Sequence, residues 1–120
     1  MTLEELYREI GGNYPSIMER LCKEERVKKF VLLFLKDTSH QQFLQALEHR
    51  NTEEAFRAIH TLKGVCMNLS FDALYQISYE MTEYLRTDNM GRAIAILPDF
   101  EACYEKHFRT ISAYADSQHS

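Results

Sequence analysis

The chain has 120 residues, a formal net charge of −4 and a hydrophobic fraction of 45%. That length suits a single domain over residues 1–120, and the hydrophobic fraction supplies a core without help from disulfides or metal ions. No apolar run approaches the ~18–20 residues that span a membrane, the N-terminus is acidic rather than signal-like, and Lys and Arg form no dense tract. We therefore expect a soluble, cytoplasmic protein that does not bind nucleic acid.

The first quarter of the chain predicts two short helices. Only four glycines and two prolines interrupt the sequence, and no stretch alternates as a strand would, which is an all-α composition. Leu3 to Ile10 is amphipathic and is followed by the break Gly11 to Asn13. Pro15 suits the first turn of the next helix, which is expected to end near Cys22.

Two longer apolar stripes follow, separated by a polar break. Glu24 to Lys36 predicts one helix because its apolar residues recur every three or four positions. Asp37 to Ser39 predicts a break, and the next helix is expected to end near Arg50. The apolar positions are Val27, Phe30, Val31, Phe34 and Leu35 before the break, and Phe43, Leu44 and Leu47 after it.

The next helix has the clearest start. Asn51 is a good N-cap, Glu54 stands three residues on as in a capping box, and Glu53 and Glu54 favour the positive end of the helix dipole. Its apolar seam, spaced four, three, four and three, is typical of a helix inside an antiparallel bundle. The seam consists of Ala55, Ile59, Leu62, Cys66 and Leu69.

Two more helices complete the chain. Ser70 is predicted to cap a helix from about Phe71 to Arg86, and Thr87 to Gly91 predicts the last turn. The final helix is expected over Arg92 to Ala115, with a kink or a late start at Pro98. The residues expected to face inward are Leu74, Ile77, Ser78, Met81 and Leu85, then Leu97, Phe100, Tyr104, Phe108 and Ile111, with His107 half-buried beside them.

Short connections between long amphipathic helices favour antiparallel neighbours. We predict an all-α fold, an antiparallel four-helix bundle with its core over about residues 24–115 and the short N-terminal helices packed against it. The three cysteines match no CxxC pattern, and each lies in an apolar helical pattern. We expect reduced thiols that pack in the protein.

His60 lies off the apolar seam of its helix. At ~100° per residue, the seam falls roughly 180° to 240° away from His60 on the helical wheel. We therefore expect the imidazole to project into solvent near the middle of a rigid helix. The residues that share its face, within roughly 60°, are Glu53, Phe56, Arg57, Lys63, Gly64 and Met67.

This face has features suited to phosphoryl transfer. An imidazole with the ordinary pKa of about 6.5 is mostly neutral and nucleophilic near pH 7. Lys63 and Arg57, one turn away on either side, are able to neutralise phosphoryl oxygens. Gly64 costs the helix roughly 1 kcal/mol relative to Ala but leaves a bare backbone where a partner can approach. Phe56 and Met67 are large apolar side chains on an exposed face, as docking requires.

Each feature taken alone has a simpler explanation. A single helical histidine is usually a surface residue, and Lys63 with Arg57 is an ordinary solvated face. Gly64 alone would suit close helix packing, and Phe56 and Met67 would suit the rim of a bundle. The residues by themselves therefore leave function open, although their shared face favours it.

The segment Ala58 to Gly64, followed by Leu69, resembles the His-x-Leu-Lys-Gly motif of bacterial histidine-containing phosphotransfer domains. The similarity extends more weakly over residues 27–111. It implies an all-α bundle in which His60 is phosphorylated, Lys63 assists the phosphate and Gly64 provides clearance for a receiver domain. Many members carry Gly where this chain has Ser70. Some carry a Gln that steadies the histidine, and Thr82 holds that place here.

The resemblance implies a carrier that accepts and donates a phosphoryl group in a multistep two-component phosphorelay. Its expected partners are receiver (response regulator) domains and a sensor histidine kinase. No Gly-rich nucleotide loop or kinase signature is present, so we expect no enzyme activity and no cofactor, with catalysis and magnesium supplied by the receiver. We expect a monomer; the partners, the signal, and whether the chain is free-standing stay open.

Two other functions are alternatives for this sequence. A scaffold that docks a receiver or kinase without passing phosphate would need Phe56 and Met67 but not His60. A metal-binding bundle would need ligands paired at helical spacing, and the sequence has no Glu-x-x-His pattern. The five histidines, none paired in that way, are His40, His49, His60, His107 and His119.

Overall fold

The computed structural model describes residues 1–118, which are about 85% helical and contain no strand. The all-α prediction is confirmed. No helix in this range is both long enough and apolar enough to cross a membrane. The elements are α1 (Leu3–Ile10), α2 (Tyr14–Leu21), α3 (Glu24–Leu33), the 3₁₀ turn η1 (Phe34–Lys36), α4 (Ser39–Glu48), α5 (Thr52–Leu69), α6 (Asp72–Arg86) and α7 (Met90–Ser117).

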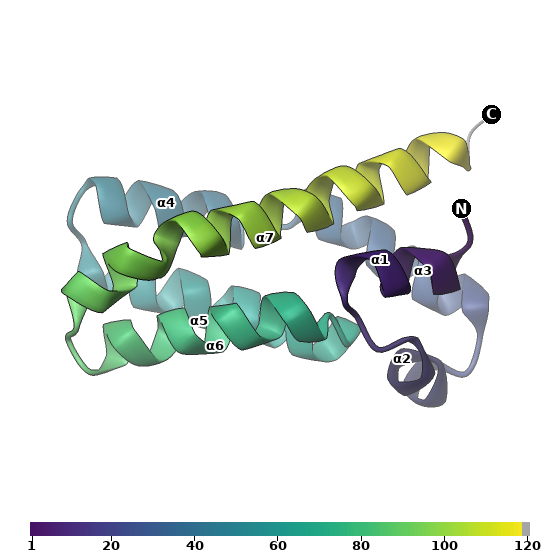
Figure 1. Cartoon of the computed structure of the whole chain (residues 1–120), viewed down its shortest axis with the longest axis horizontal. Helices are drawn as coiled ribbons and strands as arrows, with labels where there is room; N and C mark the ends of the chain where they lie inside the picture. Colours follow the sequence, from purple (N-terminus) through teal and green to yellow (C-terminus); the bar gives the residue numbers. More distant parts are fainter. Residues whose placement is uncertain (119–120) are drawn as a thin grey trace.

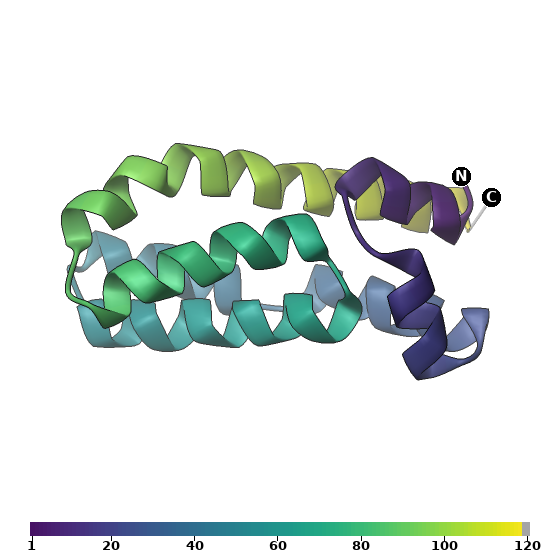
Figure 2. The same ribbon diagram turned by 60° about the horizontal axis from the view of Figure 1, so that its bottom comes forward.

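The four C-terminal helices lie alongside one another, and the three N-terminal helices gather at one end (Figures 1 and 2). In chain order, α4 packs against α5, α5 against α6, and α6 against α7. The long α7 continues past this group and also contacts α1 and α3. The molecule is accordingly elongated, with principal extents of 42 × 28 × 19 Å.

Several helices begin with an asparagine at the N-cap. The short asparagine side chain accepts a hydrogen bond from one of the first free backbone amides of the helix. Asn51 accepts from the Glu54 amide at 3.1 Å, which confirms the predicted start of α5. The Glu54 carboxylate does not complete the capping box; it pairs with Arg57. Asn13 and Asn89 cap α2 and α7 in the same way.

Ser70 ends α5 and does not cap α6. Its φ of 57° lies in the left-handed region, and its amide bonds back to the carbonyls of the last turn of α5. The N-cap of α6 is Phe71, which makes no side-chain cap bond. The sequence prediction for Ser70 was therefore wrong, because a serine suits a helix start by composition whereas this turn needs a left-handed residue.

The Ser70 turn ties α5 to the N-terminal helices. The Ser70 hydroxyl donates to Ser16 Oγ at 3.0 Å and accepts from Arg20 Nη2 at 2.5 Å. The buried Tyr7 hydroxyl donates to the Leu69 carbonyl at 2.8 Å. These bonds hold α1 and α2 against the C-terminal end of α5.

The interior of α7 differs from the predicted stripe. His107 is 1% exposed, whereas Phe108, predicted to be buried, is 36% exposed. From Phe100 onward, the buried residues are spaced four, three and four positions apart, which keeps them on one narrow face of the helix. Residue 107 lies on this face and residue 108 lies beside it. His107 Nδ1 lies 2.8 Å from the Cys103 carbonyl, and burial lowers its pKa, so the ring is neutral in the core.

Two smaller predictions were also wrong. Of the two alternatives at Pro98, the late start is not seen, because α7 begins at Met90 and continues through an exposed Pro98, and the kink stays a prediction. Cys22 is an exposed C-cap rather than a packing residue, although Cys66 is buried, Cys103 is half-buried, and all three are free thiols.

Substitutions at Ser70 can separate the cost of its left-handed backbone from the contribution of its hydroxyl hydrogen bonds to stability. Ser70→Gly and Ser70→Ala both remove the hydroxyl, but only alanine retains the cost of a left-handed backbone. We expect Ser70→Ala to be less stable than Ser70→Gly by about 1 kcal/mol in urea unfolding. Equal stability of the two variants would show that the left-handed conformation is not required.

Candidate functional site

Helix α5 positions the site by burying its opposite face. Ala55, Ile59, Leu62 and Cys66 have no exposed surface. They fix the rotation of the helix about its axis, and the face on the other side is left in solvent. His60 is exposed near the middle of this helix, as the helical wheel predicts.

The His60 ring is free of intramolecular hydrogen bonds within residues 1–118. Its one aromatic neighbour there is the half-buried Phe56, whose ring centroid lies 5.9 Å away at an interplanar angle of 39°. Both ring nitrogens are therefore available to an incoming group. A shallow hollow beside the ring is lined by Glu53, Phe56, Arg57, His60 and Thr61.

Lys63 is held by an aromatic ring on the neighbouring helix. Its Nζ lies 5.4 Å from the ring centroid of Tyr79, which is 44% exposed on α6. A cation over an aromatic face at an exposed site is stabilised by about 0.5–1 kcal/mol. This contact is weak enough for the ammonium to leave the ring for an anion, and strong enough to bias its resting position.

Tyr79 is a site residue that sequence reasoning did not find. Nothing in its local pattern marks it, because an exposed tyrosine is ordinary on a helix. Only the pairing of α5 with α6 brings Tyr79 beside Lys63. To find Tyr79 one would need the register between α5 and α6, which a single sequence does not specify.

Arg57 is already paired with carboxylates of its own helix. Its guanidinium lies 2.7 Å from Glu54 Oε1 and 3.9 Å from Glu53 Oε1, and all three side chains are substantially exposed. Exposed pairs of this kind contribute only about 0.2–1 kcal/mol. To meet an incoming anion, Arg57 must therefore first give up these local partners.

Gly64 has no packing reason to be glycine. A Cβ atom built at this position would meet no other atom within 4 Å, apart from its own helix backbone. The alternative that Gly64 serves close helix packing is therefore wrong. Met67, one turn from Gly64, is 56% exposed, so open backbone and exposed apolar surface adjoin His60.

Thr82 does not reach His60. It is 3% exposed, and its hydroxyl donates to the Ser78 carbonyl one turn earlier in α6 at 2.7 Å. Although Thr82 was placed where some family members carry a Gln that steadies the histidine, its hydroxyl is therefore not available to the imidazole in residues 1–118. The sequence predicted the position of Thr82 along α6, but it did not predict that the side chain points into the core.

The structure shows no group of three or more His, Cys, Asp or Glu side chains placed to hold a metal ion, within the residues it describes. His40 Nε2 lies 2.8 Å from Glu101 Oε2, and its ring stacks on Tyr104 at 3.6 Å between ring centroids. Of the five histidines, His119 lies outside the described residues.

A family model for the Hpt domain matches residues 33–109, well over half of the chain and all of α4 to α6. The chain belongs to the Hpt domain family. Hpt domains take part in histidine phosphotransfer in phosphorelays, as phosphocarriers that interact with receiver domains and kinases. No curated protein and no solved structure gives a match to this chain.

The contact between Lys63 and Tyr79 can be tested in the isolated Hpt domain. We expect the ε-methylene protons of Lys63 to be shifted upfield by the tyrosine ring in proton–carbon NMR spectra. Tyr79→Leu removes that shift, whereas Tyr79→Phe retains it because the aromatic face remains. An unchanged Lys63 resonance in Tyr79→Leu would contradict the contact.

Proposed function

We propose that this Hpt domain carries a phosphoryl group on His60 in a multistep two-component phosphorelay, receiving it from and returning it to aspartates of receiver domains. The observation that carries the proposal is one exposed imidazole, free of intramolecular bonds in the described chain, beside Lys63 and the open backbone of Gly64. Helices α4 to α7 would act as the antiparallel four-helix unit that holds this group rigid.

The transfer follows from the chemistry of a neutral imidazole. The Nε2 lone pair attacks the phosphorus of an aspartyl phosphate in line, a P–N bond forms, and the P–O bond to the aspartate breaks, returning a carboxylate. The Nδ1 proton, in contact with water, can be lost to solvent once the ring becomes cationic. The reverse sequence returns the phosphoryl group, because both the donor and acceptor linkages are reactive.

Positioning and charge neutralisation supply most of the rate in phosphoryl transfer. Lys63 would leave the Tyr79 ring and place its ammonium on a phosphoryl oxygen, and Arg57 would add a second cation. The magnesium ion and the reacting aspartate would come with the receiver. The Hpt domain itself therefore acts as a substrate and carrier.

Docking of the receiver would use the apolar side chains beside His60. Phe56 packs against the imidazole, and Met67 is the more exposed of the two. We propose that residues 1–120 form one domain that works as a monomer. Its cytoplasmic location stays a prediction.

Substituting His60 tests the proposed function directly. Incubation with phosphorylated receiver domains is expected to give acid-labile label on the wild-type Hpt domain and none on His60→Gln. His49→Gln is the matched control, because His49 is also an exposed histidine but lies at the C-cap of α4, away from the face of His60 on α5. Equal labelling of His60→Gln and wild type would show that the phosphoryl group resides elsewhere.

We expect Gly64→Ala to make the protein more stable and to slow phosphoryl transfer. Helix propensity predicts a gain of about 1 kcal/mol in the free energy of unfolding, because nothing surrounds the added methyl group. The same methyl group would obstruct the receiver and reduce transfer about tenfold, equivalent to about 1.4 kcal/mol of docking energy. Urea unfolding and rapid-quench transfer kinetics measure the two effects. A stabilised variant with unchanged transfer would refute the clearance role.

A further inference from the structure

Lys63 rests on a neutral aromatic ring, although the sequence has 18 Asp and Glu residues for 14 Lys and Arg. Its ammonium lies 5.4 Å from the ring centroid of Tyr79 and makes no ion pair with a carboxylate in the part of the chain that the structure describes. Arg57, the other cation of this face, is paired with Glu53 and Glu54. Carboxylates therefore oppose the charge of Arg57, whereas the charge of Lys63 stays unopposed.

Helix packing brings the Tyr79 ring and Lys63 together. Leu62, next to Lys63 on α5, and Ser78, next to Tyr79 on α6, have no exposed surface. The two helices run side by side (Figures 1 and 2). The Tyr79 ring is also flanked by Tyr75, one turn earlier on α6, at 6.2 Å between ring centroids. The place of the aromatic face is thus determined by α6 and its packing, while the long Lys63 side chain remains able to turn.

The Lys63 ammonium has a second position within reach, at His60. Residues three apart on a helix have Cβ atoms about 5–6 Å apart. Side chains of a helix also tilt towards its N-terminal end, which directs the Lys63 stem over the turn that carries His60. The four-carbon stem is flexible, so the ammonium can lie over the Tyr79 ring on α6 or beside an anion carried by the imidazole on α5. One ammonium does not occupy both positions at once.

We infer that Tyr79 is a positioning residue, whose ring holds Lys63 in the unphosphorylated protein and thereby lowers the equilibrium occupancy of His60 by a phosphoryl group. The contact stabilises only the unphosphorylated form, because Lys63 leaves the ring when its ammonium binds a phosphoryl oxygen. An interaction present in one of two forms shifts the equilibrium towards that form. Tyr79 therefore favours return of the phosphoryl group to the receiver. This inference rests on the proposed function.

A tyrosine restrains Lys63 without opposing an incoming anion. The aromatic face attracts a cation through its quadrupole and carries no net charge, so the charge of the ammonium is retained. Tyr79→Glu would also hold the ammonium, but its carboxylate would neutralise Lys63 and repel a negatively charged phosphoryl group. The side chain at residue 79 thus has two separable effects, restraint of the cation and charge near His60.

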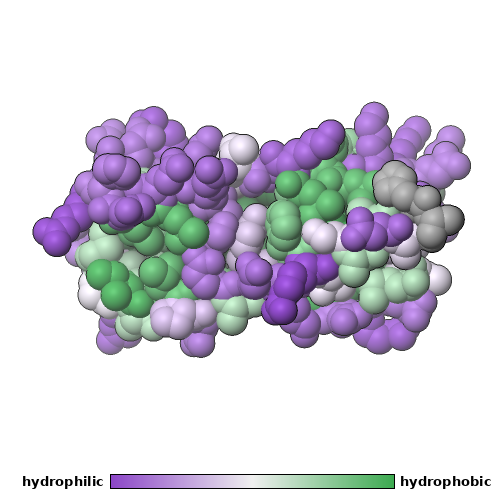
Figure 3. Space-filling view, turned by 90° about the horizontal axis from the view of Figure 1, so that it is seen from above, coloured by the Kyte–Doolittle hydropathy of each residue, from purple (hydrophilic) through white to green (hydrophobic). Residues whose placement is uncertain are grey.

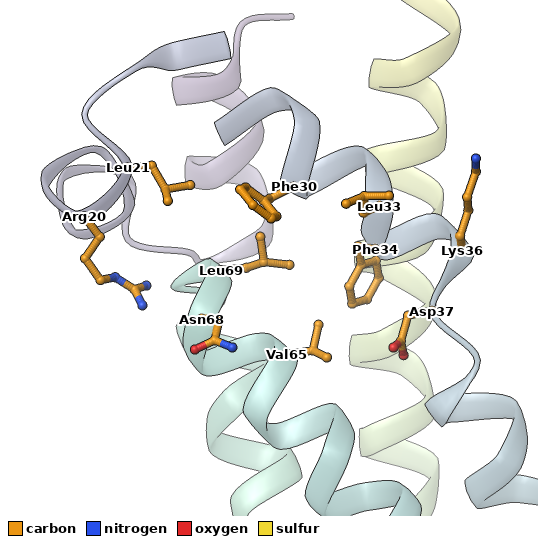
Figure 4. Close-up of a pocket in the computed structure, with 10 residues that line it drawn as sticks. All are labelled: Arg20, Leu21, Phe30, Leu33, Phe34, Lys36, Asp37, Val65, Asn68 and Leu69. Carbon is orange, nitrogen blue, oxygen red and sulfur yellow. The ribbon is translucent and has the colours of Figure 1, made fainter. Parts of the chain in front are cut away.

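The Tyr79 contact is separate from the apolar grooves of the molecule. One groove, of about 660 Å³, lies between α3 and the C-terminal half of α5, with the exposed Phe30 and Leu33 on its α3 side (Figure 4). The other lies between α4 and α7 and exposes 58% of Ile94. Figure 3 shows hydrophobic surface at that end of the molecule, seen from the side of α7. No described residue of α6 lines either groove, so substitutions at Tyr79 leave both surfaces unchanged.

The test is the equilibrium constant for phosphoryl transfer between the whole chain and a receiver domain from the same genome that exchanges phosphate with His60. This constant compares the free proteins, so it does not depend on how tightly the receiver docks. Tyr79→Leu is expected to shift it twofold to fivefold towards phosphorylated His60, equivalent to about 0.5–1 kcal/mol. Tyr79→Phe keeps the aromatic face and is expected to restore the wild-type value, whereas Tyr79→Glu is expected to shift the constant in the opposite direction.

Tyr84→Leu is the matched control, because Tyr84 is also a tyrosine of α6 but its hydroxyl donates to Glu80 at 3.0 Å. We expect it to leave the equilibrium constant unchanged. A double-mutant cycle then shows whether Tyr79 acts through Lys63. In a Lys63→Ala background, Tyr79→Leu is expected to have no effect, because no ammonium is left to restrain. Urea unfolding verifies that each variant is folded.

The outcomes separate this inference from the proposed function. If His60 exchanges phosphate but Tyr79→Leu leaves the equilibrium constant unchanged, the role of Tyr79 is wrong and the carrier function stands. If Tyr79→Leu shifts the constant equally with and without Lys63, Tyr79 acts by another route and the inference is overturned. If no receiver exchanges phosphate with His60, the proposed function fails and takes this inference with it.

Discussion

The buried seam of α5 determines where the site groups of that helix lie. Because Ile59 and Leu62 are fully buried on either side of His60 in sequence, the helix cannot rotate about its axis without bringing apolar side chains into water. Turning the imidazole inward would also bury its polar nitrogens without partners, at a further cost of a few kcal/mol. The packing that stabilises the domain is thus the same packing that presents the His60 imidazole to solvent.

A second constraint acts at the C-terminal end of α5. The left-handed turn at Ser70, together with the bond from the Tyr7 hydroxyl to the Leu69 carbonyl, anchors the N-terminal helices to this end. Arg20 extends the anchor by donating to Ser70 and to the Met67 carbonyl. Because α2 in turn packs against α3, this polar junction also connects α3 to the end of α5. Family members with glycine at the Ser70 position could adopt the turn without strain, but would lack these hydroxyl bonds.

The features that sequence predicted well are those that one helix determines by itself. The cap at Asn51, the seam of α5 and the outward direction of His60 all follow from periodicity within a single element. The failures concern how two elements face each other. Thr82 lies at a plausible height along α6 but points into the core, while Tyr79 reaches Lys63 from the same helix. A local pattern specifies the rotation of a strongly amphipathic helix about its axis. It does so poorly at the edge of the buried face, where polar and apolar residues adjoin, as at His107 and Phe108.

Several exposed positions share an energetic property that points to a partner. Gly64 lowers helix propensity with no packing benefit, and Phe30, Leu33 and Met67 leave large apolar side chains in water. Scattered over a surface, such residues would need no explanation. Here Gly64 and Met67 adjoin His60, while Phe30 and Leu33 line the groove at the end of the same helix. Folding alone would favour smaller or more polar side chains at the apolar positions and alanine at residue 64. Under the proposed function, uncovered apolar surface of this kind is what a transient protein complex requires, because it becomes binding energy when a partner docks.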